Sequence, residues 1–490
     1  MVAFNLFPSN VRTPTIGVEF ATSLVNAGPA QLPYNALIIG QKLSTGTAAV
    51  DTVVPCTSIA DAITAGGRGS ILHREAIGWF ASNQSTALFL GVLADNGAGV
   101  APTGTIVVTG PATESRTLSL YFGAVLVSVG VTVGDASTAI ATNIAAAVTA
   151  NPDLPITAVA ASSTITFTFR HKGEVGNAYD IRANYNGEKT PAGVGLTITA
   201  MGGVVAGTGN PVLTSLIAGM ATQWFQIWAH PYKDATSLTA IETELLSRAG
   251  PLRAIDGVAI TSAVGSFSTL ATLGLTRNSV YSEIIAQPGA NPLTPPMEFA
   301  AETAALIAGA ASIDPARPFN TLRYLNAVAV AAIDEFTQFP QRNLLLFDGI
   351  ATSRQLTGAV MIDRAITTFQ TNPSGQADAT YLDVTTPLTL MLLRFRFRVF
   401  MSRFSRHKLA QDGTRFGPGQ LVMTPALAKG EALTWYSDAI TDGLAQDMPT
   451  FKAGLDAVIN STDHNRLDFA LPVTLIGQLE VIGAQIQFGL

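Results

Sequence analysis

The hydrophobic pattern of residues 34–99 alternates between short apolar runs and amphipathic stretches. The runs NALIIGQ, from Asn35, and ALFLGVL, from Ala87, have the length and composition of buried strands. Between them, residues 58–65 and 70–81 show helical spacing of apolar positions, and a serine cap is expected to begin the second helix. The alternation predicts an α/β segment that ends at the glycine-rich sequence DNGAGVAPTG.

Residues 100–209 follow a different pattern. Thr- and Val-rich runs such as TIVVT, TLSLYFG, VLVSVGV, TITFTFR and LTITAM predict short strands. One alanine-rich helix is expected to be capped by Asp135 and to run to about residue 150. Glycine-rich linkers bound the segment, and exposed loops tolerate insertions, so the pattern predicts an inserted β-rich domain.

The α/β alternation returns after Pro211. Strands are predicted in WFQIWAH, GVAI and VYSEIIAQP, with helices over 235–248 and from Phe267, and an alanine-rich helix follows the joint NPLTPPM. The expected fold class is α/β, and α+β in part: a helix-covered mixed sheet body with an inserted β-rich domain and extended strand-like arms at both ends. The expected body comprises residues 37–99 and 210–340, the insertion residues 100–209, the carboxyl-terminal α/β domain residues 341–470, and the two arms residues 1–36 and 471–490.

Both arms are apolar, poor in charge and strand-like. Ile16, Val18 and Phe20 alternate near the amino terminus, and the carboxyl-terminal pattern changes phase once, which implies a bulge or two consecutive strands. The apolar positions of the second arm are Val473, Leu475, Leu479, Val481, Ile482, Ile486 and Phe488. A strand with no hairpin partner nearby must pair with a distant strand or with another chain, so we expect strand exchange between subunits.

The segment LLRFRFRVFMSRFSRHK gathers basic residues without any acid. They are Arg394, Arg396, Arg398, Arg403, Arg406 and Lys408. Strand and helix periods both fit locally, but the helix accounts for the longer span, with an apolar stripe of Leu393, Phe397, Phe400 and Phe404. Two roles stay open for the basic groups: ion pairs with acids of the same subunit, such as Asp378 or Asp383, or contact with an acidic partner.

The amino-acid composition of the chain favours a protein that is buried in an assembly. Of 490 residues, 28 are basic and 34 acidic, which gives a net charge of −6 and argues against nucleic acid as the main partner. Charged residues are 13% and hydrophobic ones 48%, so the chain is short of solvating side chains. No apolar stretch is long enough to span a membrane, and the amino terminus does not resemble a secretory signal. These features predict a cytosolically made protein without membrane insertion that buries much of its surface in an obligate assembly.

Candidate chemistry is sparse. The chain contains no phosphate-binding G-x-x-x-x-G-K-[ST] loop, no H-E-x-x-H and no G-x-S-x-G, and no two of its five histidines have the spacing of helical metal ligands. GGRGS, which ends at Ser70, is interpreted as a turn between helices, and the single cysteine, Cys56, as a buried small hydrophobe. We therefore expect no catalytic, cofactor-binding or metal-binding residues, and a protein that is not an enzyme.

Four segments together carry a resemblance to a known family. They are RHKLAQDGTRFGPGQ (406–420), TYLDVTTPLTLMLLR (380–394), NRLDFALPVTLIGQLEVIGAQIQF (465–488) and FRHKGEVGNAYDIRANY (169–185). In these segments the chain resembles the tail sheath proteins of Mu-like contractile-tailed bacteriophages. The similarity is most specific in the last third of the chain and weak between about residues 211 and 340.

The resemblance implies a structural subunit that forms six-membered rings, stacked helically around an inner tail tube. Contraction of such a sheath drives the tube through the host envelope without nucleotide hydrolysis. The implied partners are other copies of the chain, the tail tube protein, and the baseplate and tail terminator proteins, in the virion tail and, during assembly, in the host cytoplasm. The resemblance further implies that the arms exchange strands, that the inserted domain faces outward, and that the basic segment is a candidate for the tube-facing helix.

Two other classes of protein remain as alternatives. A cytosolic α/β enzyme with an inserted β domain would need a polar pocket with perturbed ionisable groups, which the sequence does not suggest. Another virion subunit, such as a tail tube or capsid protein, would also be apolar and assembled. The interrupted α/β body and the two arms favour a sheath protein over both.

Overall fold

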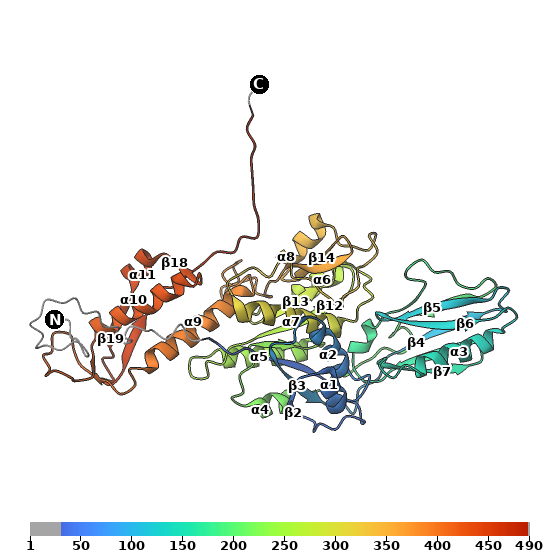
Figure 1. The fold of residues 1–490 in the computed structure, drawn as a ribbon, viewed down its shortest axis with the longest axis horizontal. Helices are drawn as coiled ribbons and strands as arrows, with labels where there is room; N and C mark the ends of the chain where they lie inside the picture. Colours follow the sequence, from blue (N-terminus) through green and yellow to red (C-terminus); the bar gives the residue numbers. More distant parts are fainter. Residues whose placement is uncertain (1–30, 489–490) are drawn as a thin grey trace, which may run out of the picture. The chain divides into compact units, whose positions relative to one another are not determined.

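The computed structural model describes residues 31–488, which form two compact units (Figure 1). The larger unit contains residues 33–394, 443–447 and 473–488. The smaller unit contains residues 31–32, 395–442 and 448–472. The predicted strand at Ile16, Val18 and Phe20 lies outside the described residues.

An eight-stranded sheet is the centre of the larger unit. Its order is β15-β14-β13-β12-β11-β1-β3-β2; the six strands from β14 to β3 run parallel, and β15 and β2 are antiparallel to their neighbours. The bounds are β1 Asn35–Gln41, β2 Thr52–Cys56, β3 Ala87–Leu93, β11 Ile227–Ala229, β12 Val258–Ala263, β13 Ser282–Ala286, β14 Ala351–Leu356 and β15 Ala359–Arg364. The predicted strands at NALIIGQ, ALFLGVL, WFQIWAH, GVAI and VYSEIIAQP are confirmed.

Helices cover both faces of this sheet. They are α1 Ile59–Gly66, α2 Ile71–Ser82, α4 Thr214–Met220, α5 Ala235–Arg248, α6 Phe267–Gly274, α7 Pro296–Ile313 and α8 Asn343–Phe347, with a π-helical turn η3 at Gln338–Arg342. On β1, Leu37 and Ile39 join the core made with α4 and α5, whereas Gly40 faces α2. Helices α2 and α7 pack side by side over that second face. The inner strands, such as β1 and β3, are largely apolar and buried because helices cover both faces of the sheet there.

The GGRGS sequence forms the predicted turn between α1 and α2. Gly67 and Gly69 have φ of 87° and 79°, the left-handed region that side chains other than glycine rarely adopt. The predicted serine cap is also confirmed, because the backbone N–H of His73 donates to the Ser70 hydroxyl at 3.1 Å.

The sheet is wider than the sequence predicts at both edges. Strand β2 was missed because Pro55 interrupts its apolar run, and proline is tolerated there because β2 is an edge strand. Strands β14 and β15 carry the sheet past residue 340, where the body was expected to end. Residues 321–324 cover the β15 edge: the N–H groups of Thr321 and Tyr324 donate to the carbonyls of Ile362 and Val360, which protects this edge from other chains.

The inserted segment folds into two antiparallel sheets and a helix. The sheets are β10-β4-β8-β7 and β6-β5-β9. The bounds are β4 Thr103–Thr109, β5 Arg116–Phe122, β6 Val125–Val131, α3 Ser137–Thr149, β7 Ile156–Ala161, β8 Thr164–Phe169, η2 Val175–Ala178, β9 Ile181–Ala183 and β10 Gly195–Thr199. The predicted cap at Asp135 is wrong: its carboxylate accepts the N–H of Thr132 at 2.8 Å in the preceding turn, and Ala136 begins the helix without a side-chain cap.

Buried polar contacts join the insertion to the body of the larger unit. The imidazole of His171 lies 2.8 Å from the carboxylate of Asp95, which also accepts the side-chain amide of Gln41 at 2.7 Å. Arg74 on α2, which pairs with Glu298 on α7, also donates to the backbone carbonyl of Asp153 in the insertion at 3.4 Å. Ile71 and Met297 belong to the same apolar core as the insertion, so the insertion extends the body rather than hanging from it by two linkers.

The smaller unit combines helices with short strand pairs. It contains the last part of α9 (Thr385–Ser402), α10 Pro425–Thr441, α11 Met448–Gly454, the parallel pair β16 Lys408–Leu409 and β17 Val422–Met423, and the antiparallel pair β19 Asp456–Ile459 and β20 Leu467–Ala470. In its interior the rings of Tyr436 and Phe451 stack with centroids 3.7 Å apart, and the ring of Trp435 packs against both at a tilt.

Glu283 is an unusual residue of the sheet. It lies on β13 with none of its surface exposed, and neither carboxyl oxygen has a hydrogen-bond partner in the described part of the chain. Burial raises its pKa from 4.5 to about 8, because an isolated carboxylate is costly to desolvate.

We predict that this carboxyl group makes the stability of the subunit depend on pH. The folded protein keeps the proton up to about pH 8, whereas the unfolded chain releases it near 4.5. Unfolding therefore releases a proton in this window, and the free energy of unfolding should fall by about 1.4 kcal/mol per pH unit as pH rises. Urea unfolding of the unassembled subunit across this window should show the slope, and Glu283→Gln should remove that part of it. An unchanged slope in the variant would contradict the assignment.

Candidate functional site

Helix α9 confirms the helical interpretation of the arginine-rich segment as far as Ser402. The helix covers Thr385–Ser402, so Arg394, Arg396 and Arg398 lie on it. Arg403, Arg406 and Lys408 follow the helix, which ends earlier than the apolar stripe predicts. In the smaller unit, Phe397 packs edge-on against Trp435 and Phe469, with ring centroids 5.1 and 5.6 Å away. Phe404 packs against the small core around Met423 and Ala428.

Arg394 is held by the larger unit. Its guanidinium donates to both oxygens of Asp256 at 2.9 and 3.1 Å and to the carbonyl of Ala249 at 2.7 Å. The Asp256 side chain is 8% exposed, whereas that of Arg394 is 40% exposed. The mostly buried carboxylate of Asp256 thus has a charged partner, and Arg394 forms its ion pair within its own subunit.

Two further arginines form ion pairs inside the smaller unit. Arg396 donates to Asp442 at 2.6 Å, and Arg403 pairs with Glu431 on α10. The guanidinium of Arg403 also lies over the rings of Phe400 and Phe404, 3.8 and 4.7 Å from their centroids. The partners therefore differ from those considered in the sequence, because Asp383 pairs with Arg364, and Asp378 accepts hydrogen bonds from Thr380.

The remaining basic groups of the segment lie at the surface. Arg398, Arg406 and Lys408 are exposed, and Lys408 donates to the side-chain carbonyl of Gln420 at 2.7 Å. The chain after them, residues 411–421, is exposed at every position. The sequence analysis singled out residues 406–420 only for their resemblance to the sheath family; their glycines, proline and polar residues are typical of a surface loop.

The carboxyl-terminal arm is anchored at its beginning and exposed at its end. Strand β21 (Thr474–Leu475) pairs antiparallel with β18 (Ala445–Gln446) in the same unit. The side chain of Gln478 donates to the carbonyl of Ala316, and Asn320 donates to Glu480 at 3.1 Å. Residues 476–488 form neither helix nor strand.

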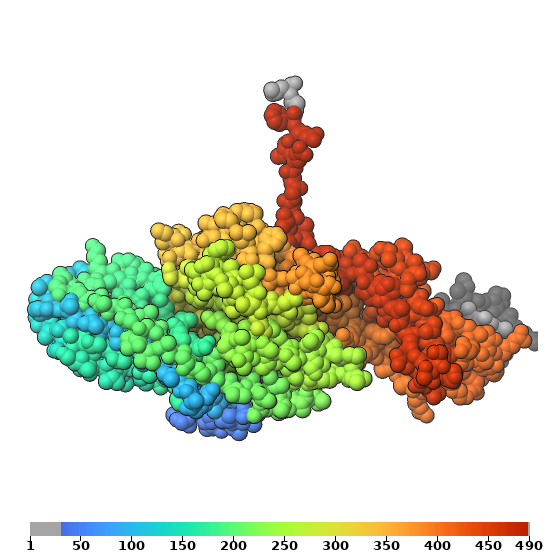
Figure 2. All heavy atoms as spheres, turned by 180° about the vertical axis from the view of Figure 1, so that it is seen from behind, coloured from blue at the N-terminus to red at the C-terminus, as the bar shows by residue number. Residues whose placement is uncertain are grey.

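The apolar side chains of the arm face solvent in the isolated subunit. Figure 2 shows the last described residues standing clear of other atoms of the larger unit. The apolar residues of the arm that have more than two thirds of their surface exposed are Leu479, Val481, Ile482, Ile486 and Phe488. Val473 and Leu475, at the anchored beginning, are only partly exposed.

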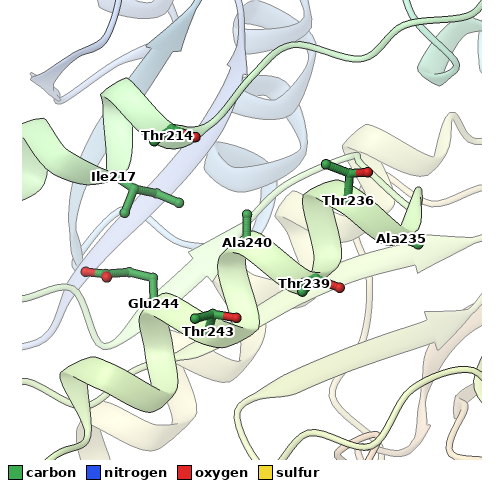
Figure 3. Close-up of a pocket in the computed structure, with 8 residues that line it drawn as sticks. All are labelled: Thr214, Ile217, Ala235, Thr236, Thr239, Ala240, Thr243 and Glu244. Atoms are coloured by element: carbon green, nitrogen blue, oxygen red, sulfur yellow. The ribbon is translucent and has the colours of Figure 1, made fainter.

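An open groove lies between α4 and α5 (Figure 3). It has a volume of about 670 Å³ and is lined by Thr214 and Ile217 from α4 and by Thr236, Thr239 and Thr243 among others from α5. Glu244 lies at the lining, but its carboxylate already pairs with Arg248 and Arg253. The groove thus offers hydroxyl and methyl groups, with no available acid–base pair for chemistry.

Buried polar side chains elsewhere do not form a metal centre. Within residues 31–488, no group of three or more His, Cys, Asp or Glu side chains is placed to hold a metal ion. Cys56 is buried, as predicted, and burial raises the pKa of its thiol to about 12. No helix among the described residues has the length and apolar character needed to cross a membrane.

Comparison with known proteins identifies the family of this chain. A family model described as the phage tail sheath protein central domain matches residues 206–368, the part that contains most of the parallel sheet. The sheath tail protein of Desulfitobacterium hafniense shares the fold at a TM-score of 0.50, with 11% identity over 95% of this chain and 98% of that one. The family model thus points to the class of phage tail sheath proteins, and the solved structure shows the same fold.

A curated relative narrows the class. The Mu-like prophage FluMu tail sheath protein of Haemophilus influenzae is 34% identical over 490 residues, which is 99% of each chain. The present chain therefore belongs to the family of Mu-like phage tail sheath proteins, and it is a structural sheath subunit. This confirms the resemblance and the fold class inferred from sequence.

We predict that the Arg394–Asp256 pair stabilises the larger unit more than an exposed pair stabilises the smaller one. Asp256→Ala leaves the Arg394 head without its carboxylate and should lower the free energy of unfolding by about 1–3 kcal/mol. The matched control is Lys429→Ala, which removes a 2.9 Å pair with Asp456 whose side chains are 41% and 56% exposed. This control should cost at most about 1 kcal/mol. Equal losses in denaturant unfolding would refute a special role for the buried pair.

Proposed function

We propose that the subunits form six-membered rings that stack helically around a tail tube, and that contraction of this sheath drives the tube through the host envelope. The observation that carries the proposal is the arm of residues 481–488, an uncharged run in which several large apolar side chains are exposed together. In water this arm leaves several large apolar side chains uncovered, each of which gains about 1.5–3 kcal/mol on full burial.

The arm is proposed to pair with a neighbouring subunit as an added strand. Val481 to Phe488 contains only apolar, glycine and glutamine residues, so either face can be buried once the backbone is paired. Strand addition supplies the main-chain hydrogen bonds of a sheet, which residues 481–488 do not form with other described residues. The amino-terminal arm, with Ile16, Val18 and Phe20, is proposed to act in the same way.

The proposed acceptor is the two-stranded sheet β19–β20 of the smaller unit. A two-stranded sheet is marginal in water by itself, and each of these strands pairs only with the other among the described residues. Added strands from neighbours would extend this sheet and join subunits through backbone bonds. Such a connection can persist while the rigid bodies of neighbouring subunits change their packing. A polymer whose interfaces have two alternative packings can release energy stored at assembly in this way.

The remaining parts have proposed places in the same assembly. The insertion of residues 100–209 is proposed to face outward, and the part around α9 to face the tube. Arg394, Arg396 and Arg403 form ion pairs in their own subunit, and the tube-facing role is best supported for the exposed basic groups that follow the helix, Arg406 and Lys408. The proposed partners are the tail tube, the baseplate and the tail terminator, in the virion and, during assembly, in the host cytoplasm. The role is mechanical, without a catalytic step or cofactor.

We predict that removal of residues 481–490 abolishes polymerisation without unfolding the subunit. The truncation spares the β18–β21 pair and the contacts of Gln478 and Glu480, so the described contacts that anchor the arm to the larger unit are kept. Size-exclusion chromatography and electron microscopy should show folded, unassembled protein, with unchanged circular dichroism.

A matched pair of full-length variants separates the sequence of the arm from its length. Ile482→Ser with Ile486→Ser should weaken assembly strongly, whereas Gln485→Ser with Gln487→Ser should not, because only the first pair removes apolar surface. Normal polymers from the truncated protein, or equal behaviour of the two double variants, would refute the strand-exchange proposal.

A further inference from the structure

The helices over one face of the central sheet form a row that runs from α4 to α8. Helices α4 and α5 share one apolar core, and α5, α6 and α8 share another on the same face. Helix α4 packs on β2 and β3, whereas α8 packs on β14. Because β2 and β14 lie near opposite edges of the sheet, α4 and α8 are at opposite ends of the row (Figure 1). A surface on α8 therefore cannot meet a surface on α4 of the same subunit.

Helix α8 carries an exposed apolar surface at its end of the row. Leu345 is buried and holds the helix on the core, but Leu344 and Phe347, which are three positions apart, are 42% and 73% exposed. Phe339, in the preceding turn η3, is 69% exposed. Arg342, which lies between them in the sequence, forms ion pairs with acids of the same unit. We call Phe339, Leu344 and Phe347 the α8 patch. Large apolar side chains exposed so close together in the chain are typical of an interaction surface.

The groove between α4 and α5 lies toward the other end of the row (Figure 3). Thr236, Thr239 and Thr243 line it from α5 with methyl and hydroxyl groups, and Ile217 lines it from α4. Glu244, the charged residue among those that line the groove, already pairs with two arginines. The exposed face of a surface helix usually carries charged side chains, and the lining of this groove has no unpaired charge. An apolar partner can therefore enter it without desolvating an isolated charge.

Charge and size indicate a second copy of the chain as the partner of both surfaces. Each copy has a net charge of −6, so two copies repel each other unless they meet through surfaces without unpaired charge. The α8 patch and the groove are both such surfaces. The groove has a volume of about 670 Å³, within the range of about 300–1,000 Å³ that buries ligands larger than a phenylalanine side chain.

We propose that the α8 patch of one subunit docks in the groove between α4 and α5 of the next, with Leu344 and Phe347 packed among the threonine methyl groups. An apolar patch at one end of a molecule and a pocket for it at the other make a head-to-tail contact, which repeats into a ring or a helical polymer. The proposal rests on the proposed function. It adds to the exchanged arms a separate contact between the bodies of neighbouring subunits.

A cross-linking experiment tests which surfaces meet. The full-length variant that combines Phe347→Cys with Thr239→Cys is polymerised and treated with a short bifunctional maleimide, while the native Cys56 is buried and does not compete. Because every subunit carries both new thiols, a head-to-tail contact should give a ladder of covalent multimers. Phe347→Cys alone should give no multimers. Phe347→Cys with Thr197→Cys, at an exposed position of the insertion, should give none either.

A matched pair of double variants measures how much the contact contributes to assembly. Leu344→Ser with Phe347→Ser removes exposed apolar surface and keeps the buried Leu345, so circular dichroism should match that of the parent. The protein concentration needed for polymerisation should rise at least tenfold, because the docked side chains lose their burial. The control, Leu126→Ser with Val159→Ser, removes side chains of similar exposure, 48% and 66%, from the insertion. It should polymerise as the parent does.

Each outcome has a separate meaning. A parent protein that does not polymerise would overturn the proposed function and this contact with it. If the parent polymerises, the proposed function stands, and equal polymerisation of the α8 patch variant or the lack of a ladder in the polymers overturns the contact alone. Dimers from Phe347→Cys alone would show that two α8 patches face each other, which also overturns it. An equal loss of assembly in the control would reduce the effect to total apolar surface and overturn docking in the groove.

Discussion

A parallel sheet must be covered on both faces, and this constraint organises the larger unit. The connections between parallel strands cross the sheet as helices, so α2 and α7 cover one face while α4 and α5 cover the other. Once both faces are closed, one edge is protected by residues 321–324 and the insertion is joined through a shared core. Among the described residues, the carboxyl-terminal arm is then a continuous exposed run of mostly apolar side chains, and it is where assembly is proposed to take place.

Most of the sheet could be predicted because its strands are continuous apolar runs and its helices have serine or aspartate caps. Ser58, Ser70, Asp234 and Ser266 each accept an N–H from the first turn of a helix, as such residues usually do. The failures have local reasons. Asp135 serves the preceding turn instead of the helix, and β2 and β14 combine apolar residues with proline or polar ones, so neither gives a clear period.

The arginine-rich segment shows which property of a surface the sequence does not predict, namely the ion-pair partners of its charged side chains. Its helical period could be predicted, since Leu393 and Phe397 have the spacing of one helix face. The partners of the arginines could not be predicted, because Asp256 lies 138 positions from Arg394 and Asp442 lies 46 positions from Arg396. Ion pairs between residues so far apart depend on the tertiary fold. Three-dimensional structure was therefore needed to distinguish the arginines that pair within their own subunit from the exposed stretch of residues 411–421.

The anchoring of the carboxyl-terminal arm has a mechanical consequence. A pull on residues 481–488 from a neighbour would first reach Glu480 and Gln478, whose bonds lead to Asn320 and Ala316 after α7. Behind them the strain would meet the β18–β21 pair, where the Ile476 N–H donates to the carbonyl of Leu444 and the Gln446 side chain donates to that of Leu475. Tension would thus be divided between two attachment points of the same rigid body. The tether can bear load without transmitting it along the sheet, and its length beyond Glu480 sets how far two subunits can slide before the connection becomes taut.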